Sequence, residues 1–147
     1  LSGSHSQATG FAGGAVTVYV VNEMRKEWER ISNEAKINVI FVGQKNGLDL
    51  DAYYYSCDVF VLPSYVEPFG AVTNEALLNG CFCIISKNAG SSCLVEEGIN
   101  GFTFDPYSVD ELVAKINVAS EFVKNRTKKN RMNISFTELM HSVFDTL

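Results

Sequence analysis

Short apolar runs, rich in β-branched residues, alternate along the chain with longer segments of helical period. The runs predict buried strands at 15–21, 37–42, 58–62, 82–86 and 101–104. One-sided apolar stripes predict helices at 22–36, 108–124 and 135–146, and shorter helices are predicted at 51–56, 70–79 and 91–97. Repeated alternation of strand and helix predicts an α/β fold, a doubly wound parallel sheet with helices on both faces.

Local signals indicate where the predicted elements end. Asp51 suits the N-cap of the helix at 51–56, Pro63 ends the strand before it, and Gly80 suits the C-terminal cap of the next helix. Ligands of such sheets bind at the carboxyl ends of the strands. The loops in which chemistry is expected are therefore 43–50, 63–70, 87–91 and 105–107.

The length and composition are those of one globular domain. The 147 residues are 46% hydrophobic and 20% charged, which argues against disorder. Residues 1–14 are small, polar and glycine-rich, so we expect a linker or a remnant of cloning there and the domain itself at 15–147. Because the chain begins with Leu1 and shows no signal peptide, we expect it to be a piece of a longer, cytoplasmic protein.

The charge argues against a nucleic-acid partner. Twelve basic and seventeen acidic side chains give a net charge of −5. A local exception is the basic run Lys124, Arg126, Lys128, Lys129 and Arg131. Such a run suits peripheral contact with a membrane surface, where each cation contributes about 1 kcal/mol. A solvated helix end, where cations complement the helix dipole, is the favoured interpretation of the run.

No metal site is predicted. The four cysteines, Cys57, Cys81, Cys83 and Cys93, match no zinc spacing and are interpreted as reduced, partly buried residues of a cytoplasmic protein. The sequence Asp49-Leu50-Asp51 has the form of an Asp-x-Asp metal motif, but it precedes a helix instead of following a strand.

The loop at 63–70 and the helix after it carry the clearest candidate chemistry. Glu67 and Glu75 are separated by seven residues. The amides of Gly70, Ala71 and Val72 open the helix and suit an anion, while a carboxylate accepts hydrogen bonds from two hydroxyls of a diol. A site for a phosphorylated sugar or a nucleotide follows. Acidic residues are also common near helix starts, so the spacing alone leaves both interpretations open.

Residues 54–106 resemble the nucleotide-binding domain of GT-B glycosyltransferases of the large retaining family four. The family motif E-x-F-G-x-x-x-x-E-A is present as Glu67-Pro68-Phe69-Gly70-Ala71-Val72-Thr73-Asn74-Glu75-Ala76. The strand before it, at 57–64, ends in the family's Pro-Ser, and the family's Asn-Gly turn and following strand match residues 100–106.

The resemblance implies a donor site for a nucleoside diphosphate sugar. Glu75 would hold the ribose hydroxyls, and Glu67 would contact the transferred sugar as the catalytic residue. The remaining donor-binding residues would be Phe69, Gly70, Ala71 and Val72 at the sugar and diphosphate, Gln44 and Lys45 at the base, and Asn88, Gly90 and Ser91 at the edge. The family transfers the sugar with retention to an acceptor glycan or lipid-linked glycan, as in polysaccharide biosynthesis, and needs no cofactor.

The chain departs from the family pattern in ways that bear on activity. The family's Gly-Arg followed by Lys-Gly, which neutralises the diphosphate, is absent, and so is the N-terminal acceptor domain. We expect both to lie upstream of this chain and expect the chain alone to be inactive. Two alternatives stay open: a non-catalytic interaction module of the same fold, and a related GT-B epimerase or phosphorylase.

Overall fold

A computed structural model describes residues 10–12, 15–20, 29–30, 33–34, 38–43, 45 and 47–124. The elements in chain order are β1 (Gly10–Ala12), β2 (Ala15–Val20), β3 (Asn38–Phe41), α2 (Gly47–Ser56), β4 (Val59–Leu62), α3 (Ala71–Leu78), β5 (Phe82–Ser86), the 3-10 helix η1 (Gly90–Leu94), β6 (Gly101–Phe104) and α4 (Val109–Val123). The five predicted strands are confirmed as β2 to β6. The short strand β1 lies in the segment predicted to be a linker.

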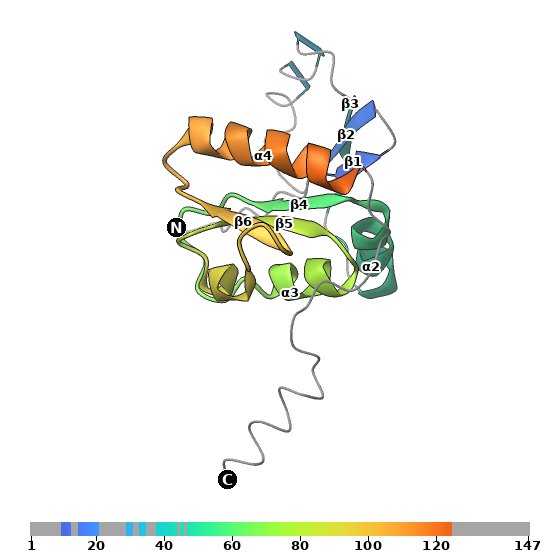
Figure 1. The fold of residues 1–147 in the computed structure, drawn as a ribbon. Helices are drawn as coiled ribbons and strands as arrows, with labels where there is room; N and C mark the ends of the chain where they lie inside the picture. The colour runs from blue at the N-terminus through green and yellow to red at the C-terminus, as the bar shows by residue number, and fades with distance from the viewer. Residues whose placement is uncertain are drawn as a thin grey trace.

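The strands form two three-stranded sheets. In the first, β1 pairs antiparallel with β2, and β2 pairs parallel with β3. In the second, β4, β5 and β6 lie side by side in that order and all pair parallel, with Val59 opposite Phe82 and Cys83 opposite Gly101. Helices α2 and α3 cover one face of this second sheet and α4 covers the other (Figure 1), which confirms the predicted doubly wound α/β architecture.

Alternate side chains of the neighbouring strands β4 and β5 face two separate cores. The core beneath α2 and α3 contains Tyr54, Cys57, Phe60, Leu62, Ala76, Leu77, Cys81, Cys83, Ile85 and Ala89. The core beneath α4 contains Val59, Val61, Phe82, Ile84, Phe104 and Ala119. Because both faces of the strands are buried, β4 and β5 read as continuous apolar runs. This packing fixes the carboxyl ends of the strands, where the candidate loops begin.

The helix ends agree only in part with the sequence signals. Gly80 closes α3 as predicted: its φ of 87° is left-handed, its amide donates to Leu77 O, and the amide of Cys81 donates to Ala76 O. The prediction of Asp51 as an N-cap is wrong, because α2 begins at Gly47 and includes Asp51 in its second turn. There the Asp51 carboxylate accepts a hydrogen bond from Asn79 Nδ2 at 3.2 Å and so connects α2 to α3.

The other predicted features are described in part. Cys57, Cys81 and Cys83 are buried thiols and Cys93 is exposed; none of the four forms a disulfide. Of the predicted helix at 22–36 only 29–30 and 33–34 are described, and they are helical, with an ion pair between Arg30 and Glu34. The predicted helix at 135–146 and the basic positions 126–131 lie outside the described residues, and no described helix is long and apolar enough to cross a membrane.

A carboxylate at the turn before β6 binds that strand and α4 together. Glu97 Oε1 accepts hydrogen bonds from the amide and the hydroxyl of Thr103, both at 2.6 Å, and Glu97 Oε2 lies 3.4 Å from Lys115 Nζ. Lys115 also lies over the Phe102 ring, 4.6 Å from its centroid. Partial burial raises the pKa of the Glu97 carboxyl, but these bonds outweigh burial and lower it overall.

We expect Glu97→Gln to reduce the sensitivity of the domain to acid. A carboxyl whose pKa is lower in the folded state stabilises that state above its unfolded pKa, and the contribution is lost as the pH falls through the folded pKa. Since the group is largely exposed, the effect should be about 0.2–1 kcal/mol. Urea denaturation at pH 7 and below pH 4 measures it. An equal stability difference between the two proteins at both pH values would contradict this assignment.

Candidate functional site

The loop after β4 and the loop after β5 are joined at the carboxyl edge of the second sheet. Glu67 and Ala89 form a parallel β-bridge. The amide of Glu67 donates to Asn88 O at 3.4 Å, and the amide of Gly90 donates to Glu67 O at 2.8 Å. Strands β4 and β5 thus continue their parallel pairing beyond their ends, and this pairing holds the backbone of Glu67 in place.

Gly90 permits this close approach of the two loops. A Cβ atom at Gly90 would lie 2.1 Å from Pro68 O and 2.9 Å from Pro68 C, distances that no side chain tolerates. The position is therefore restricted to glycine by space, not by backbone conformation. Two neighbouring contacts add to the junction: Asn88 Nδ2 donates to Tyr65 O at 2.9 Å, and Thr73 Oγ1 lies 2.8 Å from Ser91 Oγ.

The side chain of Glu67 turns back on its own loop toward the start of α3. Its Oε1 accepts hydrogen bonds from the amides of Phe69 and Gly70, at 3.3 and 3.2 Å. The second oxygen, Oε2, accepts none from the described part of the chain. Glu67 is half-buried, so one carboxylate oxygen is held by the protein while the other is positioned to accept a hydrogen bond from a hydroxyl.

The first amide groups of helix α3 point toward the loop that carries Glu67. Its N-cap, Gly70, has a left-handed φ of 66° and provides no side-chain cap. The first two helical residues, Ala71 and Val72, have no carbonyl one turn earlier in the helix to accept from their amides. These amides and the helix dipole favour an anion. An anion that also bound the amides of Phe69 and Gly70 would have to compete with Glu67.

Glu75 lies one turn further along α3 and is half-buried. Its charge acts on the phenol of Tyr54, a buried residue of α2. Burial raises the pKa of Tyr54, and the charge of Glu75 raises it further, so the phenol remains protonated. Nothing in the spacing of the sequence identified Tyr54, because its proximity to Glu75 arises from the packing of α2 on α3.

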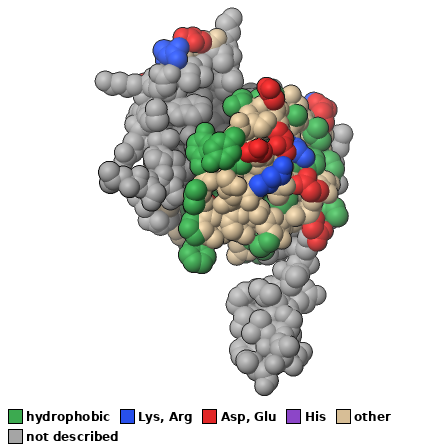
Figure 2. Space-filling model, turned by 90° about the vertical axis from the view of Figure 1, so that its left-hand side faces the viewer, with side chains coloured by type: hydrophobic (Ala, Val, Ile, Leu, Met, Phe, Trp, Pro, Cys, Tyr) green, Lys and Arg blue, Asp and Glu red, His purple; other side chains and the backbone are tan. Residues whose placement is uncertain are grey.

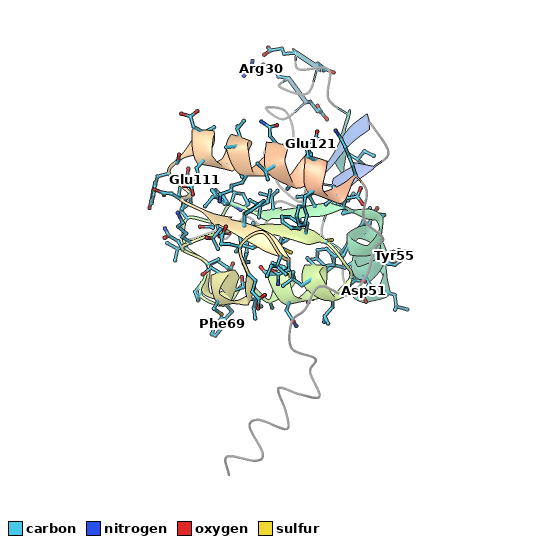
Figure 3. The ribbon with its side chains drawn as sticks, in the orientation of Figure 1. Arg30, Asp51, Tyr55, Phe69, Glu111 and Glu121 are labelled. Atoms are coloured by element: carbon cyan, nitrogen blue, oxygen red, sulfur yellow. The ribbon has the colours of Figure 1, made fainter. Side chains whose placement is uncertain are left out.

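The structure brings most of the predicted site residues together at one edge. Figure 3 shows Phe69 near the start of α3, at the lower left, with Glu111 of the first turn of α4 above it at the same edge. Figure 2, which faces this edge, shows hydrophobic side chains beside acidic and basic ones. Contacts between the two loops and the start of α3 bring eight of the predicted residues together there. They are Glu67, Phe69, Gly70, Ala71, Val72, Asn88, Gly90 and Ser91.

Of the two residues predicted to face a base, the structure describes Lys45. Lys45 lies over the ring of Tyr53 in α2, with its Nζ 5.9 Å from the ring centroid. Gln44 lies outside the described residues. At the other end of the site, the hydroxyl of Ser64 is buried and has no hydrogen-bond partner within the described part of the chain. Among these residues no cluster of three or more His, Cys, Asp or Glu side chains is arranged to hold a metal ion.

Comparisons with known proteins agree on the fold. The chain is 30% identical over 115 residues to a galactosyltransferase of Escherichia coli, UDP-Gal:alpha-D-GlcNAc-diphosphoundecaprenol alpha-1,3-galactosyltransferase, covering 78% of this chain and 29% of that protein. It is 34% identical over 98 residues to the uncharacterized glycosyltransferase MJ1607 of Methanocaldococcus jannaschii, covering 63% of this chain and 25% of that protein. The chain thus spans less than a third of the length of these relatives.

Solved structures give the same result. The Anabaena protein Alr3699/HepE in complex with UDP superposes with a TM-score of 0.60 and 26% identity, covering 85% of this chain and 36% of that one. Sucrose-phosphate synthase from Thermosynechococcus elongatus superposes with a TM-score of 0.60 and 28% identity, covering 71% and 29%. Residues 12–135 match the family Glycosyl transferases group 1. The chain therefore belongs to this family and corresponds to the C-terminal, Rossmann-like domain of its GT-B members.

Proposed function

We propose that this domain binds the nucleoside diphosphate sugar of a retaining glycosyltransferase, which transfers the sugar to an acceptor glycan or lipid-linked glycan. One observation carries the proposal: Glu67 and Glu75, both half-buried, flank the N-terminus of α3, and the Glu67 carboxylate is partly held by the amides of Phe69 and Gly70. The amides of Ala71 and Val72 lie between them and suit the diphosphate. Relatives that share this region include a UDP-galactose-dependent enzyme and a protein solved with UDP.

The two carboxylates have different tasks in this proposal. Glu75, fixed on a helix, accepts hydrogen bonds from the two ribose hydroxyls. Glu67, in the loop, uses its Oε2 for a hydroxyl of the sugar that is transferred and is the catalytic residue that contacts it. Catalysis then depends on holding the donor and on stabilising the diphosphate as it leaves. No metal ion or cofactor is part of the proposal.

Glu75→Ala should weaken nucleotide binding by about 10- to 100-fold, since it removes hydrogen bonds to a charged acceptor. The measurement is a titration with UDP, GDP and ADP and with their sugars, followed by amide chemical shifts. One nucleotide should shift residues 67–75 and 88–91 in the wild type. Glu121→Ala is the matched control, because Glu121 is an exposed glutamate on α4, across the sheet from α3. Equal affinities of wild type and Glu75→Ala would contradict the proposal.

A second candidate is an interaction module without catalytic activity. It is favoured by large exposed side chains beside the site: Tyr65, Val66, Phe69 and Tyr107 are 60%, 72%, 84% and 74% exposed. The rings of Tyr65 and Tyr107 lie with their centroids 5.3 Å apart. The two candidate functions are distinguished by repeating the nucleotide titration with a protein that also contains the family's Gly-Arg and Lys-Gly residues. Nucleotide binding by that protein supports the enzyme, and no shift at millimolar nucleotide supports the module.

A further inference from the structure

Two largely exposed tyrosines lie together at the carboxyl edge of the second sheet, and the donor site uses neither of them. Tyr65 comes from the loop after β4, and Tyr107 from the turn between β6 and α4. Their ring centroids are 5.3 Å apart, and the ring planes meet at 37°. Rings so exposed contribute little to the core, and large exposed aromatic groups gathered on one surface are typical of a binding site.

Side chains of the neighbouring segments hold the backbone of both tyrosines. Asn88 Nδ2, from the loop after β5, donates to Tyr65 O at 2.9 Å. The amide of Tyr107 donates to Asp105 Oδ1 at 2.9 Å. Glu111, labelled in Figure 3, fixes the same turn, because its Oε2 accepts from the amide of Asp105 at 3.0 Å. The pair is therefore built from the segments that follow β4, β5 and β6, and its backbone is in place before any ligand binds.

The charged groups connected to the pair favour a ligand that is neutral and rich in hydroxyls. Asp105 and Glu111 are acidic, and Lys87, the cation bound to this network, is paired with Glu111 at 3.1 Å. Glu67, two residues after Tyr65, adds a carboxylate oxygen that accepts no hydrogen bond from the described part of the chain. Carboxylates repel an anionic ligand but accept hydrogen bonds from hydroxyls.

The position of the pair relates it to the sugar end of the donor. In the proposed function Glu75 binds the ribose, the start of α3 binds the diphosphate, and Glu67 contacts the sugar that is transferred. Tyr107 belongs to the turn that leads to α4, which covers the face of the sheet opposite α3. The pair therefore lies beyond Glu67 when the site is followed outward from α3, on the side from which an acceptor reaches the sugar.

We propose that Tyr65 and Tyr107 form a carbohydrate-binding platform, on which a sugar ring of the acceptor glycan stacks next to the transferred sugar. The inference rests on the proposed function, which places that sugar at Glu67. A sugar ring has C–H groups on its faces and hydroxyls at its rim. It therefore covers the tyrosine rings while its hydroxyls donate to carboxylates such as Glu67 and Asp105. A platform whose backbone is held in advance loses little conformational entropy on binding.

The platform is tested first without a ligand. Nuclear Overhauser effects between the rings of Tyr65 and Tyr107 should be present in the free protein, and the ring signals should not depend on protein concentration. Absence of these effects would show that the rings do not lie together and would overturn the proposal. Ring signals that shift and broaden as the protein is concentrated would show that a second copy of the chain covers the tyrosines, which also overturns it.

Carbohydrate binding is measured by titration with three oligosaccharides, maltotriose, mannotriose and triacetylchitotriose, and is followed by the ring signals of the two tyrosines. At least one of them should shift both rings, with a dissociation constant on the order of 1 mM. Tyr107→Ala and Tyr65→Ala should each weaken this binding about 5- to 10-fold, and Tyr107→Phe, which keeps the ring, less than about twofold. Tyr55→Ala removes an exposed tyrosine of α2 and is the matched control, with unchanged affinity. The proposal is overturned if none of the three oligosaccharides shifts the rings, or if Tyr107→Ala binds as tightly as the wild type.

Nucleotide binding separates this inference from the proposed function. Tyr107→Ala should bind UDP, GDP or ADP with the affinity of the wild type, because the rings lie beyond the sugar end of the donor. Equal losses of nucleotide and oligosaccharide binding in this variant would assign the rings to the donor site and overturn the proposal. If the wild type binds no nucleotide, the proposed function fails, and the oligosaccharide titration still decides whether the two rings bind carbohydrate.

Discussion

Phe82→Ala is expected to lower the free energy of unfolding by about 3–5 kcal/mol, a large part of the 5–15 kcal/mol that stabilises a domain. Phe82 opens the central strand β5 and is fully buried. Its ring lies 4.8 Å from that of Phe122 in α4 and 5.2 Å from that of Phe102 in β6, measured between centroids. Truncation leaves a cavity beneath α4, so chemical denaturation should show a lower midpoint.

Two variants separate cavity formation from loss of a phenylalanine as such. Phe69 is 84% exposed, so Phe69→Ala should change stability by no more than about 0.5 kcal/mol. Phe82→Leu retains most of the buried volume and should cost less than Phe82→Ala. Similar losses for Phe82→Ala and Phe69→Ala would show that α4 is not seated on this core.

The fold could be predicted because a strand that is buried on both faces is a continuous apolar run in the sequence. The runs at 59–62 and 82–86 are apolar at every position or nearly so, and each apolar position faces one of the two cores. The sequence signal for the start of a helix is weaker. Asp51 precedes apolar residues as an N-cap does, yet the half-buried Leu50 packs on the core and belongs to the same helix, which begins at Gly47. Tertiary packing overrode the local signal.

The site was predictable to the extent that it is local. Glu67, Gly70 and Glu75 lie within one loop and one helix, so their spacing indicates a ligand at the start of α3. The contact of Thr73 with Ser91 joins residues 18 positions apart, and the hydrogen bond of Asn79 to Asp51 joins residues 28 positions apart. The bonds of Glu67 to the amides of Phe69 and Gly70 depend on loop geometry. No spacing rule encodes such contacts, and they require the structure.

The junction of the two loops makes Gly90→Ala a substitution that should lower both the stability of the domain and the affinity of the site. The added Cβ would lie 2.1 Å from the Pro68 carbonyl oxygen, which is backbone and cannot rotate away. The loops must separate, and the 2.8 Å bond from the residue 90 amide to Glu67 O lengthens or breaks. We expect a stability loss of about 1–3 kcal/mol and, because Glu67 loses its backbone support, at least about tenfold weaker donor binding.

Gly98→Ala is the matched control for this substitution. Gly98 has a left-handed φ of 74°, but a Cβ there would meet nothing within 4 Å, so the variant bears about 1–2 kcal/mol of backbone strain without a collision. Its donor affinity should equal that of the wild type even where its stability falls by a similar amount. Hydrogen exchange at the amides of residues 67 and 90 should accelerate only in Gly90→Ala. If both variants bound donor equally well, the pairing of the two loops would not be what holds Glu67 in place.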